Sequence, residues 1–147
     1  MRVERPHYGN DMPIALFRLL RLVVLEDLFG PAATATGYLA GKKLGSTLPL
    51  ASLDDFLRLC EDMRLGRVSA RQIATGHFHV DVEECLTCAG LRPVGRPVCS
   101  FESGLIAGAL QRITGQAVVS REVTCIGGLG DATCGFEIHI GNPAEMK

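Results

Sequence analysis

Apolar residues in the first half of the chain recur at spacings of three and four, the period of an α-helix. Met12-Pro13 predicts the start of one helix, since proline fits the first helical turn, and Gly30-Pro31 predicts its end. The apolar positions between them cover most sides of this helix rather than one stripe. Such a helix is usually buried. We therefore expect a central core helix, with contact to a second copy of the chain as the alternative.

A second helix is predicted over about residues 31–44, and a third over about 53–65. The second helix carries Gly37, Gly41 and Gly45 at four-residue spacing. Each glycine costs a helix about 1 kcal/mol relative to alanine. Three glycines on one face therefore predict close approach of another backbone.

Beyond Gly66 the pattern changes to alternation of apolar and polar residues, which is typical of strands. Strands are predicted near residues 68–73, 77–83, 117–123 and 136–140, with a fourth helix over about 101–114. Because helices fill the first half and strands the second, the sequence favours an α+β domain. We expect an antiparallel sheet of four to five strands packed with about four helices.

The composition supports one folded domain over residues 1–147. Hydrophobic residues make up 47% of the chain and charged residues 21%, which argues against extended disorder. A chain of 147 residues is long enough to bury a core. It contains no evident linker, internal repeat or low-complexity segment, so a single domain is expected.

The charge balance limits the classes of partner. The net charge is −1, so nothing favours nucleic acid as a partner. The apolar run over residues 14–25 contains Arg18 and Arg21 and is shorter than the roughly 20 residues that span a bilayer, so no membrane span is expected. With no secretory signal before that run, the six cysteines indicate thiolate chemistry in a cytoplasmic protein rather than disulfides.

Candidate metal ligands lie in the last third of the chain, and they are Cys99, Glu122, Cys125 and Cys134. Thiolates and carboxylates both bind zinc. Cys99 precedes the fourth predicted helix and Cys134 begins the last strand, so one ion would join a helix start to a hairpin. Four protein ligands would make this a closed, structural zinc site. The alternative is that the cysteines are small core residues.

A further pair, Cys85-x-x-Cys88, follows the strand predicted over 77–83. The spacing suits a second metal site, a redox pair, or an iron–sulfur cluster completed by Cys99. Four ligands cannot be assigned to this pair without borrowing from the first set. Reduced structural thiols or a redox pair are therefore favoured over a second metal.

Some of these motifs resemble a known family. The chain is similar to the 4-vinyl reductase (4VR) domain, a family of predicted hydrocarbon-binding proteins, and also to the zinc-containing sensor domain of phenol-responsive activators and the vesicle-transport (TRAPP) subunit fold. The similarity is specific over residues 85–140 and weaker elsewhere. The motifs that carry it are Pro97-Val98-Cys99-Ser100-Phe101-Glu102-Ser103-Gly104-Leu105-Ile106-Ala107-Gly108, Glu122-x-x-Cys125 and Gly130-Asp131-x-x-Cys134-x-Phe136.

The resemblance implies a NO-signalling/Golgi-transport ligand-binding-like fold. It also implies zinc at the four residues matching the sensor ligands (Cys99, Glu122, Cys125 and Cys134), and a homodimer, for which the N-terminal helix is the expected contact. It further implies a pocket between helices and sheet for a small hydrophobic or aromatic ligand. The residues expected to line that pocket, each of which would also suit a plain core, are Phe56, Met63, Phe78, Val80 and Val82.

The leading hypothesis for function is a zinc-stabilised binding module for a hydrocarbon or tetrapyrrole-type ligand. Such a module senses or carries its ligand and acts through a separate signalling or biosynthetic partner protein. One alternative is an enzyme or accessory in vinyl-tetrapyrrole (bacteriochlorophyll-type) reduction. A reductase needs a hydride donor, and the sequence contains no nucleotide-binding motif, so an enzyme is not favoured. The other alternative is a redox or iron–sulfur protein using Cys85, Cys88 and Cys99.

Overall fold

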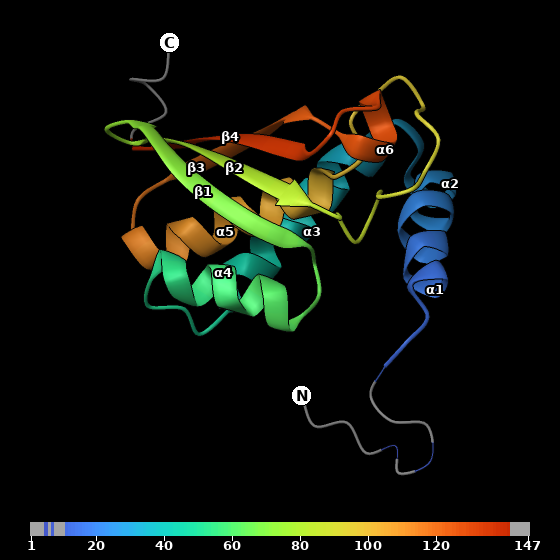
Figure 1. The fold of residues 1–147 in the computed structure, drawn as a ribbon, viewed down its shortest axis with the longest axis horizontal. Coiled ribbons are helices and arrows are strands. Elements are labelled where there is room, and N and C mark those ends of the chain that lie inside the picture. The colour runs from blue at the N-terminus through green and yellow to red at the C-terminus, as the bar shows by residue number, and fades with distance from the viewer. Residues whose placement is uncertain (1–4, 6, 8–10, 142–147) are drawn as a thin grey trace.

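The computed structural model describes residues 5, 7 and 11–141, which form a four-stranded sheet with helices on one face (Figure 1). Neighbouring strands are antiparallel and follow the order β1-β2-β4-β3. The predicted α+β fold with an antiparallel sheet is confirmed. The strands are β1 (Arg67–Ala74), β2 (His77–Glu83), β3 (Val118–Thr124) and β4 (Cys134–Ile140).

The helices form two groups in Figure 1. Three pack under the sheet: α3 (Ala33–Thr47), α4 (Leu53–Asp62) and α5 (Ser100–Thr114). At one end of the molecule lie α1 (Ile14–Leu19), α2 (Leu25–Phe29) and the single turn α6 (Ile126–Leu129), with a π-helical turn over Leu20–Val24 and a 3-10 turn over Gly30–Ala32.

Helices α3 and α5 pack backbone to backbone, as the glycine spacing predicts. A Cβ atom on Gly41 would overlap the carbonyl oxygen of Phe101, and one on Gly104 would overlap the carbonyl oxygen of Tyr38. Glycines on both helices therefore allow the approach. The close contact fixes the first turn of α5, which carries part of the candidate site.

The core lies between the sheet and helices α4 and α5. Phe136 and Ile138 of β4 and Val80 of β2 are fully or almost fully buried there. Phe56 of α4 covers this side of the sheet and is 1% exposed. Helix α4 begins with a capping box, in which the Ser52 side chain accepts the Asp55 N–H and the Asp55 side chain accepts the Ser52 N–H. Such a cap contributes about 1 kcal/mol to helix stability.

The N-terminal helical segment (residues 14–29) differs from its prediction as a core helix. Its leucines face outward, with Leu16 57% and Leu19 56% exposed, whereas Arg21 is its buried residue. The prediction was wrong because periodicity shows which sides are apolar but not whether the same chain covers them. Contact with a second copy remains a prediction. In the described residues, no helix is long and apolar enough to span a bilayer.

Candidate metal centre and adjoining pocket

Three separate segments bring the predicted ligands together. Cys99 is the N-cap residue of α5, Cys125 follows β3, and Cys134 is the first residue of β4. A register shift after Glu122 bends the end of β3, as the three-residue spacing to Cys125 requires. The ligand atoms of these four residues lie within 4.8 Å of one another.

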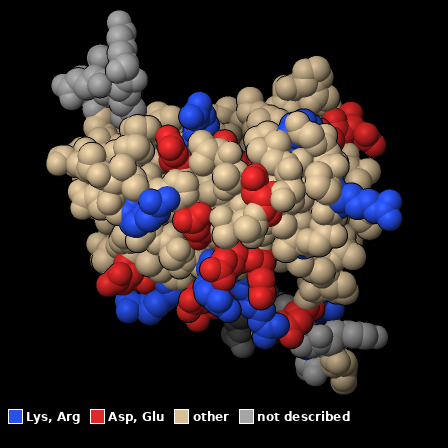
Figure 2. Space-filling model, turned by 45° about the horizontal axis from the view of Figure 1, so that its top comes forward, with Lys and Arg blue, Asp and Glu red and all other residues tan. Residues whose placement is uncertain are grey.

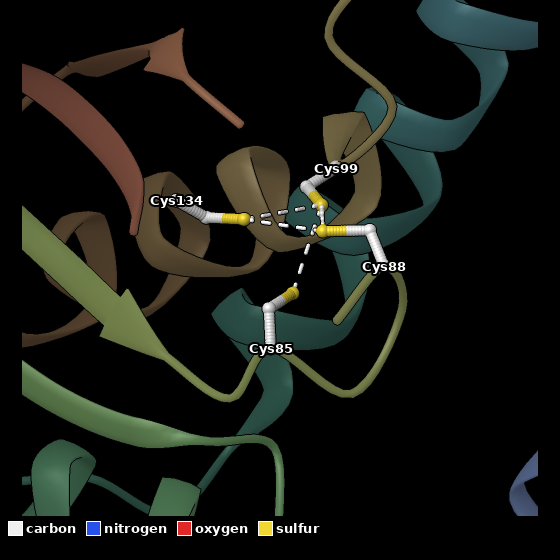
Figure 3. Close-up of side chains that lie close together, drawn as sticks. All are labelled: Cys85, Cys88, Cys99 and Cys134. Carbon is white, nitrogen blue, oxygen red and sulfur yellow. Dashed lines mark hydrogen bonds between the residues drawn. The ribbon is translucent and has the colours of Figure 1, made fainter. Parts of the chain in front are cut away.

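The Cys85–Cys88 pair joins the same cluster rather than forming a separate site (Figure 3). The Cys88 N–H donates to the Cys85 carbonyl at 3.2 Å, which closes a turn and points both thiols inward. The Cys88 sulfur lies 3.2 Å from that of Cys134 and 3.3 Å from that of Cys99. Sequence reasoning did not place this pair against the first ligand set, because the contact depends on how the loop folds back.

The sulfur separations favour a mononuclear ion over an iron–sulfur cluster. Tetrahedral zinc with Zn–S bonds of about 2.3 Å places its sulfurs about 3.8 Å apart. The Cys99 sulfur lies 3.8 Å from that of Cys134 and 4.0 Å from that of Cys125. An iron–sulfur cluster interposes iron and sulfide between its cysteines, which would hold their sulfurs farther apart.

Glu122 has the environment of a carboxylate that awaits a cation. Its Oε2 accepts the Cys99 N–H at 2.9 Å, while its Oε1 is buried without a hydrogen-bond partner. Burial raises the pKa of Glu122 to about 9, since a buried negative charge without compensation is unfavourable. A divalent ion would supply that compensation, so the residue fits a metal site.

Hydrogen bonds within the site prepare the thiols for metal binding. A hydrogen bond with Cys125 lowers the pKa of Cys88 to about 4, and one with Cys134 lowers the pKa of Cys125 to about 6. Thiolates are the form that binds metal. Backbone positions are fixed as well, because Asp131 accepts the Cys125 N–H at 2.8 Å and the Ile126 N–H donates to the Cys134 sulfur at 3.4 Å.

Two arginines of the N-terminal segment anchor the turn between Cys85 and Cys88. The Arg18 Nε donates to the Leu86 carbonyl at 2.9 Å. The Thr87 hydroxyl donates to Glu102, whose other carboxylate oxygen lies 3.7 Å from Arg21. These contacts were missed from the sequence. The available signal was the presence of two arginines in an otherwise apolar helix.

A pocket of about 730 Å³ adjoins the metal centre between α3, α5 and β3. This volume lies in the usual range for small-molecule sites, about 300–1,000 Å³. Glu122 belongs to both the pocket wall and the candidate ligand set. Other lining residues are Pro31, Ala35, Tyr38, Leu39, Ser103 and Ser120.

The five residues predicted to line a pocket lie elsewhere. Phe56, Val80 and Val82 are buried in the core, Phe78 packs against it, and Met63 is 46% exposed. The only cavity that includes any of them has a volume of about 20 Å³ among the pockets of the described residues, too small for an organic ligand. Strongly apolar residues at regular spacing fill a core, whereas the larger pocket is lined by small and hydroxyl-bearing residues without such a pattern.

The surface charge agrees with the near-neutral sequence. On the face shown in Figure 2, acidic and basic side chains are interspersed. This distribution lacks the concentrated positive charge expected of a nucleic-acid-binding face.

Comparison with known proteins identifies the family. The vinyl-4-reductase domain matches residues 78–140. Among relatives, the uncharacterised protein MJ1642 of Methanocaldococcus jannaschii is 27% identical over 132 residues, which is 90% of this chain and 80% of that protein.

Solved structures confirm the fold. A vinyl-4-reductase family protein from Methanocaldococcus jannaschii superposes with a TM-score of 0.73 at 18% identity, covering 92% of this chain and 85% of that one. The phenol-responsive sensory domain of the activator PoxR, solved with phenol, gives 0.64 at 20% identity, with coverages of 88% and 75%.

The predicted likeness to the vesicle-transport fold is also confirmed. Subunit 3 of a trafficking protein particle complex from Naegleria fowleri, covalently bound to palmitic acid, gives a TM-score of 0.66 at 14% identity. The superposition covers 88% of this chain and 95% of that one. With this shared fold and the family match across β2, α5, β3 and β4, the chain belongs to the vinyl-4-reductase domain family.

Proposed function

We propose that this chain is a binding module for a small hydrophobic or aromatic molecule, stabilised by a zinc ion at Cys99, Glu122, Cys125 and Cys134. The observation that carries the proposal is the double position of Glu122. Its carboxylate lies within the four-residue ligand group and also forms part of the pocket wall. Zinc would therefore hold one wall of the pocket in place.

The pocket wall suits a mainly apolar ligand that carries one polar group. Pro31, Ala35 and Leu39 offer apolar surface, whereas Ser103 and Tyr38 carry hydroxyl groups. Such a combination orients a ligand while burying most of its surface. The structures with phenol and with palmitic acid give a precedent for apolar molecules on this fold. Hydrocarbon and tetrapyrrole ligands remain within the proposed class.

Binding without catalysis follows from the coordination proposed for the ion. Four protein ligands leave no open position for water or substrate, which is the mark of a structural zinc site. We propose accordingly that the chain, as a cytoplasmic single-domain protein, senses or carries its ligand and passes the signal or cargo to a separate protein.

The test combines metal content with ligand affinity. Native mass spectrometry of protein purified without chelator should show bound zinc, and calorimetry with phenol and a long-chain fatty acid should show binding of at least one. The Ala35→Trp variant fills the pocket from an exposed wall position and should weaken that binding at least tenfold. Ala51→Trp, at an exposed position outside the pocket lining, is the matched control. Absence of zinc, or unchanged binding by Ala35→Trp, would refute the proposal.

A further inference from the structure

The five cysteines around the candidate centre form one continuous sulfur cluster with no exposed surface. The Cys99 sulfur lies at its middle. It is within 4.0 Å of four other sulfurs, those of Cys85, Cys88, Cys125 and Cys134. A tetrahedral ion binds four donors. The cluster and the neighbouring carboxylate therefore contain more donors than one ion uses.

These donors divide into two groups of four that share two members. Both groups have all their ligand atoms within 4.8 Å of one another. Cys99 and Cys134 belong to both groups, which are otherwise completed by Glu122 with Cys125 and by Cys85 with Cys88. A thiolate can bind two metal ions at once, as in the two-zinc, six-cysteine DNA-binding modules. The sharing of two cysteines is therefore what a bridged pair of ions requires.

We propose that the centre holds two zinc ions bridged by the thiolates of Cys99 and Cys134. The first ion is the one already proposed, completed by Glu122 and Cys125. The second ion is completed by the Cys85–Cys88 pair. This inference rests on the proposed zinc site and adds an ion to it.

Charge balance supports the second ion. One zinc ion with three thiolates and a carboxylate leaves an excess of two negative charges. A second divalent ion arrives with two further thiolates, so the excess does not grow. Without that ion, Cys85 and Cys88 would remain as thiols buried against a negatively charged centre. The second ion thus uses both thiols at no net electrostatic change.

A single ion bound by four cysteines is the competing arrangement. Cys88 lies 3.9 Å from Cys125, so Cys88, Cys99, Cys125 and Cys134 could surround one ion. That arrangement leaves the Cys85 thiol unused and leaves Glu122 Oε1 buried without a partner. An unsatisfied buried polar group costs about 1–3 kcal/mol. Two bridged ions use all six donors.

The surrounding structure holds the second ligand pair in place before metal arrives. Arg18 binds the Leu86 carbonyl, and Thr87 binds the buried Glu102 carboxylate. Both contacts fall between the two cysteines of the Cys85–Cys88 turn. A turn fixed in this way loses little conformational freedom on binding an ion.

The experiment counts ions per chain by native mass spectrometry of protein expressed with zinc and purified under reducing conditions. His77→Ala is used as the background, because His77, Glu137 and His139 form a separate surface group able to bind metal. We expect two zinc ions in this background. The added double substitution Cys85→Ser/Cys88→Ser should reduce the count to one, while added Cys60→Ser, outside the cluster, should keep two.

A second measurement tests the bridge itself without relying on a variant. Cadmium-substituted protein should give two cadmium NMR resonances coupled to each other through the shared sulfurs, and two uncoupled resonances would overturn the bridge. One zinc ion in the His77→Ala background, or two in the double substitution, would overturn the proposal. So would a mass lower by two hydrogens, which indicates a disulfide. Absence of zinc from every sample would instead refute the proposed zinc site itself.

Discussion

Cys134 connects the last strand to the rest of the candidate centre. It is fully buried as the first residue of β4, and its sulfur accepts the Ile126 N–H. Its sulfur also lies 3.2 Å from that of Cys88 and 3.8 Å from that of Cys99. Metal at this residue would therefore tie β4, the loop before α5 and the turn after β2 into one unit.

Replacing Cys134 by Ser is expected to remove bound zinc and destabilise the fold. Structural zinc supplies several kcal/mol of folding free energy in small domains, so the melting temperature should fall by roughly 10 °C or more. A chelator should lower the melting temperature of the native chain but not that of Cys134→Ser. The control is Cys60→Ser, also buried but outside the metal-ligand groups. A variant Cys134→Ser that still responds to chelator would contradict this prediction.

Residue chemistry explains which parts of the site the sequence reveals. Few side chains bind zinc, so Cys99, Glu122 and Cys125 stand out by type and spacing alone. Arg21 does not, because an arginine is buried only when a tertiary partner such as Glu102 meets it. The shared position of Cys85 and Cys88 against the first ligand set likewise depends on loop packing, which no local pattern encodes.

Among the elements, the α3–α5 pair carries the tightest packing requirement. A Cβ atom on Gly41 would meet the backbone of Phe101 rather than a flexible side chain. The helices would have to move apart, and α5 begins at the metal centre. The glycine spacing therefore links helix packing to the geometry of the ligand at Cys99.

The Gly41→Ala variant is expected to lose about 3 kcal/mol of unfolding free energy, at the upper end of the cost of overpacking. Lys43→Ala, at an exposed position of the same helix, should change it by less than about 0.5 kcal/mol. Urea unfolding of the zinc-loaded proteins compares the two. Equal stability of the two variants would show that the helices can separate without cost.

Element prediction succeeded where the local pattern and the tertiary environment agree. Helices α3, α4 and α5 and the four strands follow from periodicity and from stop signals such as Gly115, which takes a positive φ of 69° at the end of α5. The N-terminal segment shows the limit. Its apolar sides were evident, but their exposure depends on what else is present to cover them.

At the scale of the whole molecule, the N-terminal segment connects an outward apolar surface to the metal centre. Leu16 and Leu19 face outward on it, while Arg18 and Arg21 reach the turn that carries Cys85 and Cys88. A partner bound to the leucines would therefore be mechanically close to the site. A second copy of the chain is the partner we propose.

This arrangement predicts a dimer that a single surface charge disrupts. Leu19→Glu places a carboxylate where an apolar contact is expected, so the mass measured by light scattering should fall from that of two chains to that of one. Zinc content and melting of the monomer should persist, because Leu19 is 56% exposed and supports little of the core. Val94→Glu changes a residue that is 61% exposed in the loop before α5 and should leave the dimer intact. If both variants keep the native mass, the exposed leucines do not form the interface.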